Sequence, residues 1–169
     1  MSHTDDTAST SPEAARLSEV EFAIIVLGNG FGKWVVHCAE AAGARGMSAL
    51  DILVLHAVNQ RARDKRLADI CLVLNVEESH TVAYALKKLE EQGYVQHRQD
   101  GRDRIYAASA DGDALCERYL AVREKALVES LKADDIDFSR LDETARALGR
   151  LTRYYAHASR AATVATRKR

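Results

Sequence analysis

Apolar residues recur at steps of three and four along most of the chain, and this spacing predicts a mainly helical protein. The first helix is expected to begin at Pro12, because Ser11 supplies a capping hydroxyl and proline suits the first helical position. It is predicted to run to about Ala42, thinned or interrupted by glycines at positions 28, 30 and 32. The apolar face of this helix is formed by Val20, Ile24, Leu27, Phe31, Trp34, Val35 and Cys38.

The middle of the chain carries signals for shorter helices followed by a hairpin. Ser48 and Asp51 have the spacing of a capping box at a helix start, and Gly93 stands where a helix commonly ends. After Gly93 the apolar period changes to two, and Asp100-Gly101 is a strong tight-turn signal between β-prone runs. The predicted elements are a helix from residue 48, a short helix 67–74, a turn 75–77, a helix 78–92, and strands 94–98 and 104–107.

Two long helices are predicted at the end of the chain, over residues 111–131 and 137–165. Apolar residues in the second helix repeat at heptad-like spacing: Leu141, Ala145, Leu148, Leu151, Tyr155, Ala158 and Ala162. The patterns together divide the chain into a disordered tail (1–11), an N-terminal helical region (12–47), a core (48–109) and C-terminal helices (110–169).

Composition bears on the cellular compartment and on the kind of partner that the protein can bind. The 169 residues include three widely spaced cysteines, an odd number that argues against a disulfide framework and for reduced thiols in the cytoplasm. The chain lacks a continuous apolar run of about 18 residues, so no membrane span is expected, and residues 1–11 lack the pattern of a secretory signal. The net charge of −1 neither supports nor excludes a nucleic-acid partner, because binding depends on where charge is placed.

Residues 65–109 are predicted to form a helix, a turn, a second helix and a two-stranded hairpin, which is the order of a winged helix-turn-helix. The fold class is therefore mainly α with a small β-hairpin wing, flanked by long N- and C-terminal helices. The second helix is expected to enter the major groove of DNA, with Val82, Ala85, Leu86 and Leu89 packed inward. The outward face, predicted to read bases through short polar side chains and phosphates through lysines, carries Ser79, His80, Thr81, Ala83, Tyr84, Lys87 and Lys88.

The predicted wing carries three arginines, Arg98, Arg102 and Arg104, around a glycine turn. Such an arginine can enter a narrow, electronegative minor groove, so all three are candidate DNA contacts. Asp103 cannot attract phosphate, and we expect it to hold Arg102 or Arg104 in place through a bidentate pair.

The segment LADICLVLNVEESHTVAYALKKLEEQGYVQHRQDGRDRIYAAS, residues 67–109, resembles the DNA-binding core of MarR-type regulators. The resemblance implies that the flanking helices form a homodimer interface and that two recognition helices read the half-sites of a pseudo-palindromic double-stranded DNA. By position it implies base or phosphate contacts from His80, Thr81, Ala83, Tyr84, Lys87 and Lys88, and wing contacts from Arg102 and Arg104.

The sequence therefore predicts a homodimeric transcription regulator that binds specific double-stranded DNA, with a small-molecule effector or an oxidant as alternative modulators. The alternative is a winged-helix protein-interaction module that does not bind DNA. It is favoured by the near-zero net charge and by Glu77 and Glu78 beside the predicted recognition helix.

Trp34, His37 and Cys38 lie within one helical turn and are a candidate ligand or redox site. The competing interpretation is that Cys38 is a small buried hydrophobe. The six histidines show no pair at metal-ligand spacing on one helix face, so no metal is expected. No paired carboxylates, Ser-His or Cys-His arrangement or phosphate loop can be assembled, so neither a catalytic residue nor a cofactor is expected, and the protein is predicted not to be an enzyme.

Overall fold

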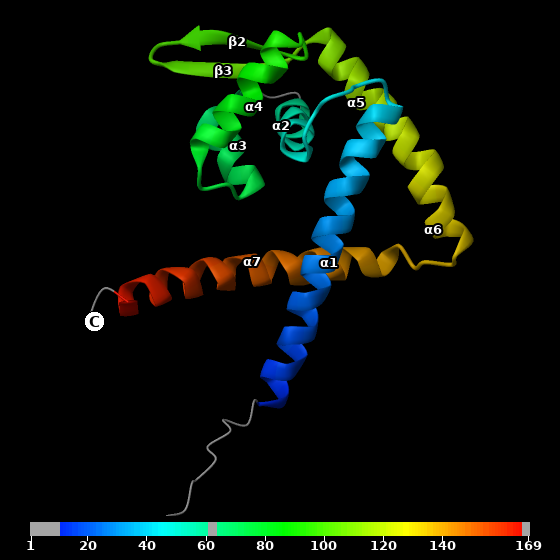
Figure 1. Cartoon of the computed structure of the whole chain (residues 1–169), viewed down its shortest axis with the longest axis vertical. Helices are drawn as coiled ribbons and strands as arrows, with labels where there is room; N and C mark the ends of the chain where they lie inside the picture. The colour runs from blue at the N-terminus through cyan, green and yellow to red at the C-terminus, as the bar shows by residue number, and fades with distance from the viewer. Residues whose placement is uncertain (1–10, 61–63, 167–169) are drawn as a thin grey trace, which may run out of the picture. The chain divides into compact units, whose positions relative to one another are not determined.

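The computed structural model describes residues 11–60 and 64–166. The predicted tail 1–11 lies outside these residues except for Ser11. The chain divides into two compact units, residues 1–125 and 126–169, and each is described by itself. The first unit holds the predicted helix-turn-helix and hairpin (Figure 1).

Helix α1 (Pro12–Ala41) begins as predicted, with the Ser11 hydroxyl accepting a hydrogen bond of 3.1 Å from the backbone of Ala14. It passes through Gly28, Gly30 and Gly32 without a break, because glycine in a helix interior costs only about 1 kcal/mol and does not forbid helical geometry. Only its C-terminal third enters the core, through Val35, Cys38 and Ala39.

The exposed part of α1 is apolar on more than one side. Phe22, Ile25, Val26 and Leu27 are each more than half exposed. By length and composition alone, α1 reaches the range of a membrane-crossing helix, with a mean hydropathy of 1.4 in its most apolar window, of which 17% is buried. Glycines and scattered polar residues interrupt this window, so it contains no continuous apolar run of about 18 residues.

Helix α2 (Ala49–Asn59) lies at the centre of the first unit and contacts α1, α3, α4 and α5. The predicted capping box is confirmed: the Ser48 amide donates to Asp51 Oδ2 at 2.7 Å, and the Asp51 amide donates to the Ser48 hydroxyl at 3.2 Å. Helices α3 (Leu67–Leu74) and α4 (Ser79–Glu91) follow, within a residue of their predicted bounds.

The wing is a three-stranded antiparallel sheet in the order β1-β3-β2. Strands β2 (Val95–Asp100) and β3 (Asp103–Ala108) confirm the predicted hairpin, and Gly101 turns between them at φ +61°. The added strand β1 (Lys65–Arg66) pairs with β3. Two residues cannot show a period-two pattern, so the sequence did not reveal this strand.

Helix α5 (Ala110–Arg123) is followed by a π-helical turn (Glu124–Val128) and helix α6 (Glu129–Ala133), where a single helix 111–131 was predicted. The division between the two units falls within this π-helical turn.

Helix α7 (Ser139–Thr166) forms most of the second unit and matches the predicted final helix. None of its 28 described residues is buried. Most of the stability of a helix in a protein comes from packing of its apolar face, so the stripe of α7 is a candidate contact surface.

Candidate nucleic-acid interface

The two faces of α4 are sorted as predicted. Val82, Ala85, Leu86 and Leu89 are buried in the core of the first unit. On the opposite side Tyr84 is 72% exposed, and Ser79, His80 and Lys87 are exposed as well. Thr81 and Ala83 are half-buried at the edges of this face. A ridge of short polar side chains with one aromatic ring therefore stands out from the start of α4.

The beginning of α4 is organised by backbone and side-chain bonds to Glu78. The Thr81 hydroxyl donates to the Glu78 carbonyl at 2.8 Å, so its orientation is fixed. His80 Nε2 lies 3.7 Å from the Glu78 carboxylate, and both side chains are largely exposed. A helix start also directs backbone N–H groups and the positive end of its dipole outward, which suits a phosphate.

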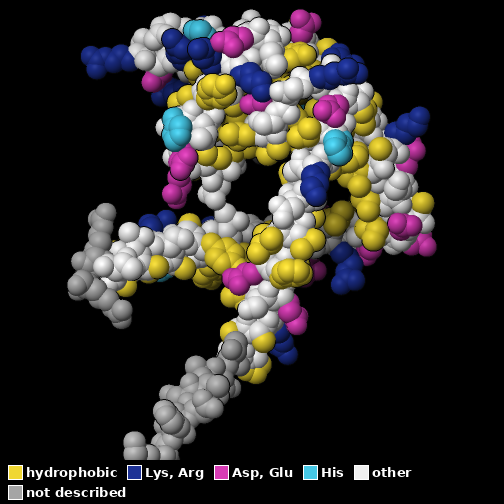
Figure 2. All heavy atoms as spheres, in the orientation of Figure 1, with side chains coloured by type: hydrophobic (Ala, Val, Ile, Leu, Met, Phe, Trp, Pro, Cys, Tyr) yellow, Lys and Arg dark blue, Asp and Glu magenta, His cyan; other side chains and the backbone are white. Residues whose placement is uncertain are grey.

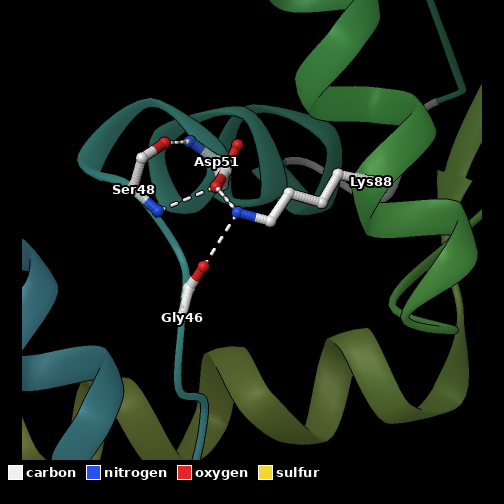
Figure 3. A network of polar contacts seen from close by, with 4 residues as sticks. All are labelled: Gly46, Ser48, Asp51 and Lys88. Atoms are coloured by element: carbon white, nitrogen blue, oxygen red, sulfur yellow. Dashed lines mark hydrogen bonds and ion pairs between the residues drawn. The ribbon is translucent and has the colours of Figure 1, made fainter.

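The second half of α4 is anchored to its surroundings. Lys88 reaches α2, where its Nζ donates to Asp51 Oδ2 at 2.7 Å (Figure 3). On the neighbouring strand β2, His97 contacts the carboxylate of Glu90 through Nδ1. The Lys88 side chain is only 29% exposed. Lys87, by contrast, is exposed, and its Nζ lies 3.8 Å from the carboxylate of Glu91 one turn further along the helix. The two lysines predicted to bind phosphate therefore differ: Lys87 is exposed, and Lys88 is directed into the protein.

The arginines of the wing also divide into two kinds. Arg98 donates from Nη2 and Nε to Asp64 Oδ2, at 2.9 and 3.2 Å, and so fastens β2 to the segment before β1. Arg102 and Arg104 are exposed at and beside the tip. The expected partner of Asp103 was one of these two, but its carboxylate instead lies 3.4 Å from Arg66 Nε on β1. The strand pairing explains this correction, because β1 and β3 are neighbours.

An open groove of about 870 Å³ runs between α3, the start of α4 and β3. Its charged groups come from Arg66, Arg102 and Arg104 together with the carboxylates of Glu77 and Asp103, and Ser79 of α4 reaches its rim. Figure 2 shows Lys and Arg side chains gathered over the wing in this part of the molecule. The groove therefore joins the exposed start of α4 to the basic wing in one continuous surface.

The structure places Trp34, His37 and Cys38 in different surroundings. Trp34 is half-buried, His37 is exposed, and Cys38 is 1% exposed with its Sγ donating to the Tyr119 carbonyl at 3.6 Å. Burial raises the pKa of the Cys38 thiol, an effect that an interaction with the Tyr119 side chain and the charge of Arg123 only partly oppose. A protonated, enclosed thiol is a poor target for oxidants, which argues against a redox role for Cys38.

A small polar cluster beside Cys38 left no recognisable signal in the sequence. The rings of His56 and Tyr119 meet edge-on with centroids 4.5 Å apart, and they line a cavity of about 10 Å³. Burial, helped by the charge of Arg123, lowers the pKa of His56. The cavity is too small for a ligand, and within residues 11–60 and 64–166 no three His, Cys, Asp or Glu side chains are grouped to hold a metal ion.

Comparison with known proteins agrees with this geometry. Residues 47–112 match the model of a winged helix DNA-binding domain, and this match spans the predicted core. A MarR-family regulator from Rhodococcus sp. RHA1 superimposes with a TM-score of 0.64 at 17% sequence identity, covering 78% of this chain and 90% of its own. NMB1585, a MarR family regulator from Neisseria meningitidis, gives a TM-score of 0.62 at 18% identity over 85% of this chain and 98% of its own.

The chain is a winged-helix protein with the MarR fold. CouR from Rhodococcus jostii RHA1, whose structure holds p-coumaroyl-CoA, shares the fold with a TM-score of 0.63 at 16% identity, over 76% of this chain and 88% of its own. No curated protein sequence matches the chain. The predicted resemblance to MarR-type regulators is thereby confirmed at the level of the fold.

Several contacts that shape this MarR-fold surface were invisible in the sequence. Asp51 carried a recognised signal, but only as the acid of a capping box, and its second partner Lys88 lies 37 residues away. The partners of Arg98 and Arg66 are likewise set by how β1 joins the sheet. No local spacing rule predicts such pairs.

Proposed function

We propose that the protein is a homodimeric transcription regulator that binds specific sequences in double-stranded DNA. The observation that carries the proposal is the continuous surface formed by the exposed start of α4 and the groove lined by Arg66, Arg102 and Arg104. A major groove admits an α-helix, and an arginine-bearing wing reaches the neighbouring backbone or minor groove. Binding to chromosomal DNA places the protein in the cytoplasm.

The side chains of this surface are assigned by reach and charge. Ser79, His80, Thr81, Ala83 and Tyr84 face the base edges, where short polar groups give hydrogen bonds and Ala83 gives an apolar contact to a thymine methyl. The cationic groups of Lys87, Arg102 and Arg104 contact phosphates or the minor groove. Arg98 supports the wing through Asp64.

A second copy of the chain is the proposed partner of the exposed apolar helices. α7 carries its stripe without one buried residue among the 28 described, and α1 exposes Phe22, Ile25 and Leu27. Figure 2 shows hydrophobic side chains along the exposed length of α1. A membrane would also cover an apolar helix, but the C-terminal third of α1 belongs to the core of the first unit, which a buried span could not share. Two-fold pairing would place two α4 helices about 34 Å apart, one turn of DNA.

A small-molecule effector is part of the proposal. The support is the structure of CouR, which has the same fold and is described as bound to p-coumaroyl-CoA. Differential thermal unfolding against a panel of aromatic acids and their thioesters tests this point, because a ligand that binds only the folded state raises the Tm.

Selection of bound sequences from random duplex DNA at two salt concentrations tests the proposed function. We expect a pseudo-palindromic site whose affinity falls steeply with salt, because each neutralised phosphate releases a counterion. Failure of the full chain to retain any duplex even at low salt would contradict the proposal. It would favour the protein-interaction module, for which Glu77 and Glu78 beside α4 are the supporting observation.

A further inference from the structure

Lys88 links α4 to two other parts of the first unit, and we call this link the Lys88 tie. Its Nζ donates to Asp51 Oδ2 at 2.7 Å and to the Gly46 carbonyl at 2.8 Å, so one ammonium joins α4 to α2 and to the segment before α2 (Figure 3). The Asp51 side chain is 5% exposed and also accepts the Ser48 amide. The ammonium therefore has two oxygen partners inside the first unit and its side chain is largely covered.

The segment that Lys88 reaches is the connector between α1 and α2, residues 42–48. Gly43 and Gly46 have φ of +98° and +73°, which a residue with a side chain adopts only with strain. Arg118 on α5 donates from Nε to the Ala42 carbonyl at 2.8 Å. The connector is thus held by a cation from α5 at one end and by a cation from α4 at the other.

Releasing Lys88 toward DNA would leave Asp51 as a buried carboxylate without its cation. Such a group is strongly unfavourable, and the remaining bonds from Ser48 do not supply a positive charge. Glu90 and His97 hold the other side of the same helical turn against β2. The C-terminal half of α4 is therefore fastened to α2 and to the wing, while its N-terminal half stays exposed.

We propose that Lys88 and Asp51 are positioning residues that set the placement of the recognition helix α4 on DNA from inside the protein. The inference rests on the proposed function and refines it, because Lys88 leaves the set of predicted phosphate contacts. The α1–α2 connector, which Lys88 and Arg118 both hold, therefore also influences the orientation of α4 on the base pairs.

The two roles of Lys88 predict opposite results for Asp51→Asn. If Lys88 contacts phosphate, neutralising Asp51 frees the ammonium and binding is equal or tighter. If Lys88 positions α4, the same substitution loosens the tie and weakens binding. The salt dependence separates the roles independently, because removing one phosphate contact lowers the slope of log K against log salt by about 0.9. A small shift of α4 that weakens base contacts but keeps the phosphate contacts leaves the slope unchanged.

The experiment measures fluorescence anisotropy of the selected duplex against salt for the full chain and four variants: Lys88→Met, Asp51→Asn, their double variant, and Lys87→Met. We expect Lys88→Met and Asp51→Asn each to weaken binding about tenfold, the effect of losing one base contact, at every salt concentration. The double variant should be no weaker than either single variant, because both break one tie. Lys87→Met, the matched control, should lower the slope.

A lower slope for Lys88→Met, or equal or tighter binding by Asp51→Asn, would overturn the inference. The double variant keeps the test decisive if a single variant fails to fold, since it contains no unpaired buried charge and should fold with the wild-type slope and weaker binding. Circular dichroism checks folding in each case. If the wild-type chain itself binds no duplex, the proposed function fails, which is distinguishable from a failure of the positioning role.

Discussion

The three cysteines differ in their surroundings, and this difference decides their chemistry. Cys38 and Cys116 are buried in the core, while Cys71 is half-buried at the groove beside α3. Burial, reinforced by the charge of Asp113, raises the pKa of Cys116 to about 11, and burial raises that of Cys38. A thiol with a raised pKa stays protonated at neutral pH and is a weak nucleophile.

Labelling with a disulfide reagent at neutral pH should therefore proceed in two phases. Cys71 is expected to react first, and Cys38 and Cys116 only when the protein unfolds in denaturant. The rate is followed by release of the coloured thiolate. In Cys71→Ser the fast phase should vanish. Rapid labelling of Cys38 in the folded Cys71→Ser variant would contradict this account and make Cys38 a redox candidate again.

Asp51 links stability to pH. Burial raises its pKa, but the hydrogen bonds from Lys88 and Ser48 outweigh burial, and the net pKa lies below the ordinary 3.8. A carboxyl with a lowered folded pKa contributes stability above its unfolded pKa and loses it as the pH falls through the folded value. Urea unfolding should show a smaller loss of stability between neutral pH and about pH 3 for Asp51→Asn than for wild type. Equal losses would contradict the account.

At the scale of elements, α5 begins against the end of α4. The Ser109 hydroxyl donates to the Gly93 carbonyl at 2.6 Å, and a Cβ on Gly112 would lie 2.1 Å from the Tyr94 carbonyl oxygen. This close approach requires glycine at position 112, although its helix would otherwise prefer alanine.

Gly112→Ala should therefore destabilise the protein by about 3 kcal/mol, because backbone must move to relieve the overlap. Gly149→Ala in α7 is the matched control, since no described atom outside its chain neighbours and the adjacent backbone of its own helix lies within 4 Å of its Cβ position, and alanine is the better helix former there. Urea unfolding of both variants measures the difference. Similar free energies of unfolding for Gly112→Ala and Gly149→Ala would show that the backbone around Tyr94 accommodates the added Cβ at little cost.

The sequence predicted the elements that carry local signals. Ser11, Ser48 and Gly93 marked helix boundaries, and the turn at Gly101 marked the hairpin. It did not predict strand β1 or the π-helical turn after α5, because neither leaves a periodic pattern.

Within the site, the inward face of α4 was predictable from its period. The difference in exposure between Lys87 and Lys88 could not be predicted, because these residues are only about 100° apart on the helix and contacts from α2 decide which one is enclosed. The same holds for Asp103, whose partner Arg66 depends on a strand that the sequence did not reveal.

At the scale of the whole molecule, the exposed stripe of α7 is the feature that we propose a second copy covers. Leu141 is 45% exposed, and replacing it with Asp would bury an unpaired charge in the proposed interface. We expect Leu141→Asp to shift the protein toward monomer by at least about 2 kcal/mol. Sedimentation velocity measures this shift.

Arg150→Asp introduces the same charge off the stripe and serves as the control. It should sediment as wild type does. A wild-type chain that sediments as a monomer at all concentrations would contradict the homodimer.

The most direct test of the central claim, that α4 and the wing form a DNA-binding surface, is the salt dependence of binding by Lys87→Ala/Arg102→Ala/Arg104→Ala on the selected duplex. All three side chains are exposed, so the variant should fold as wild type does. The account predicts lost retention at moderate salt and a slope of log K against log salt reduced by about 0.9 for each phosphate contact removed. Unchanged affinity and an unchanged slope would show that DNA, if bound, is held elsewhere.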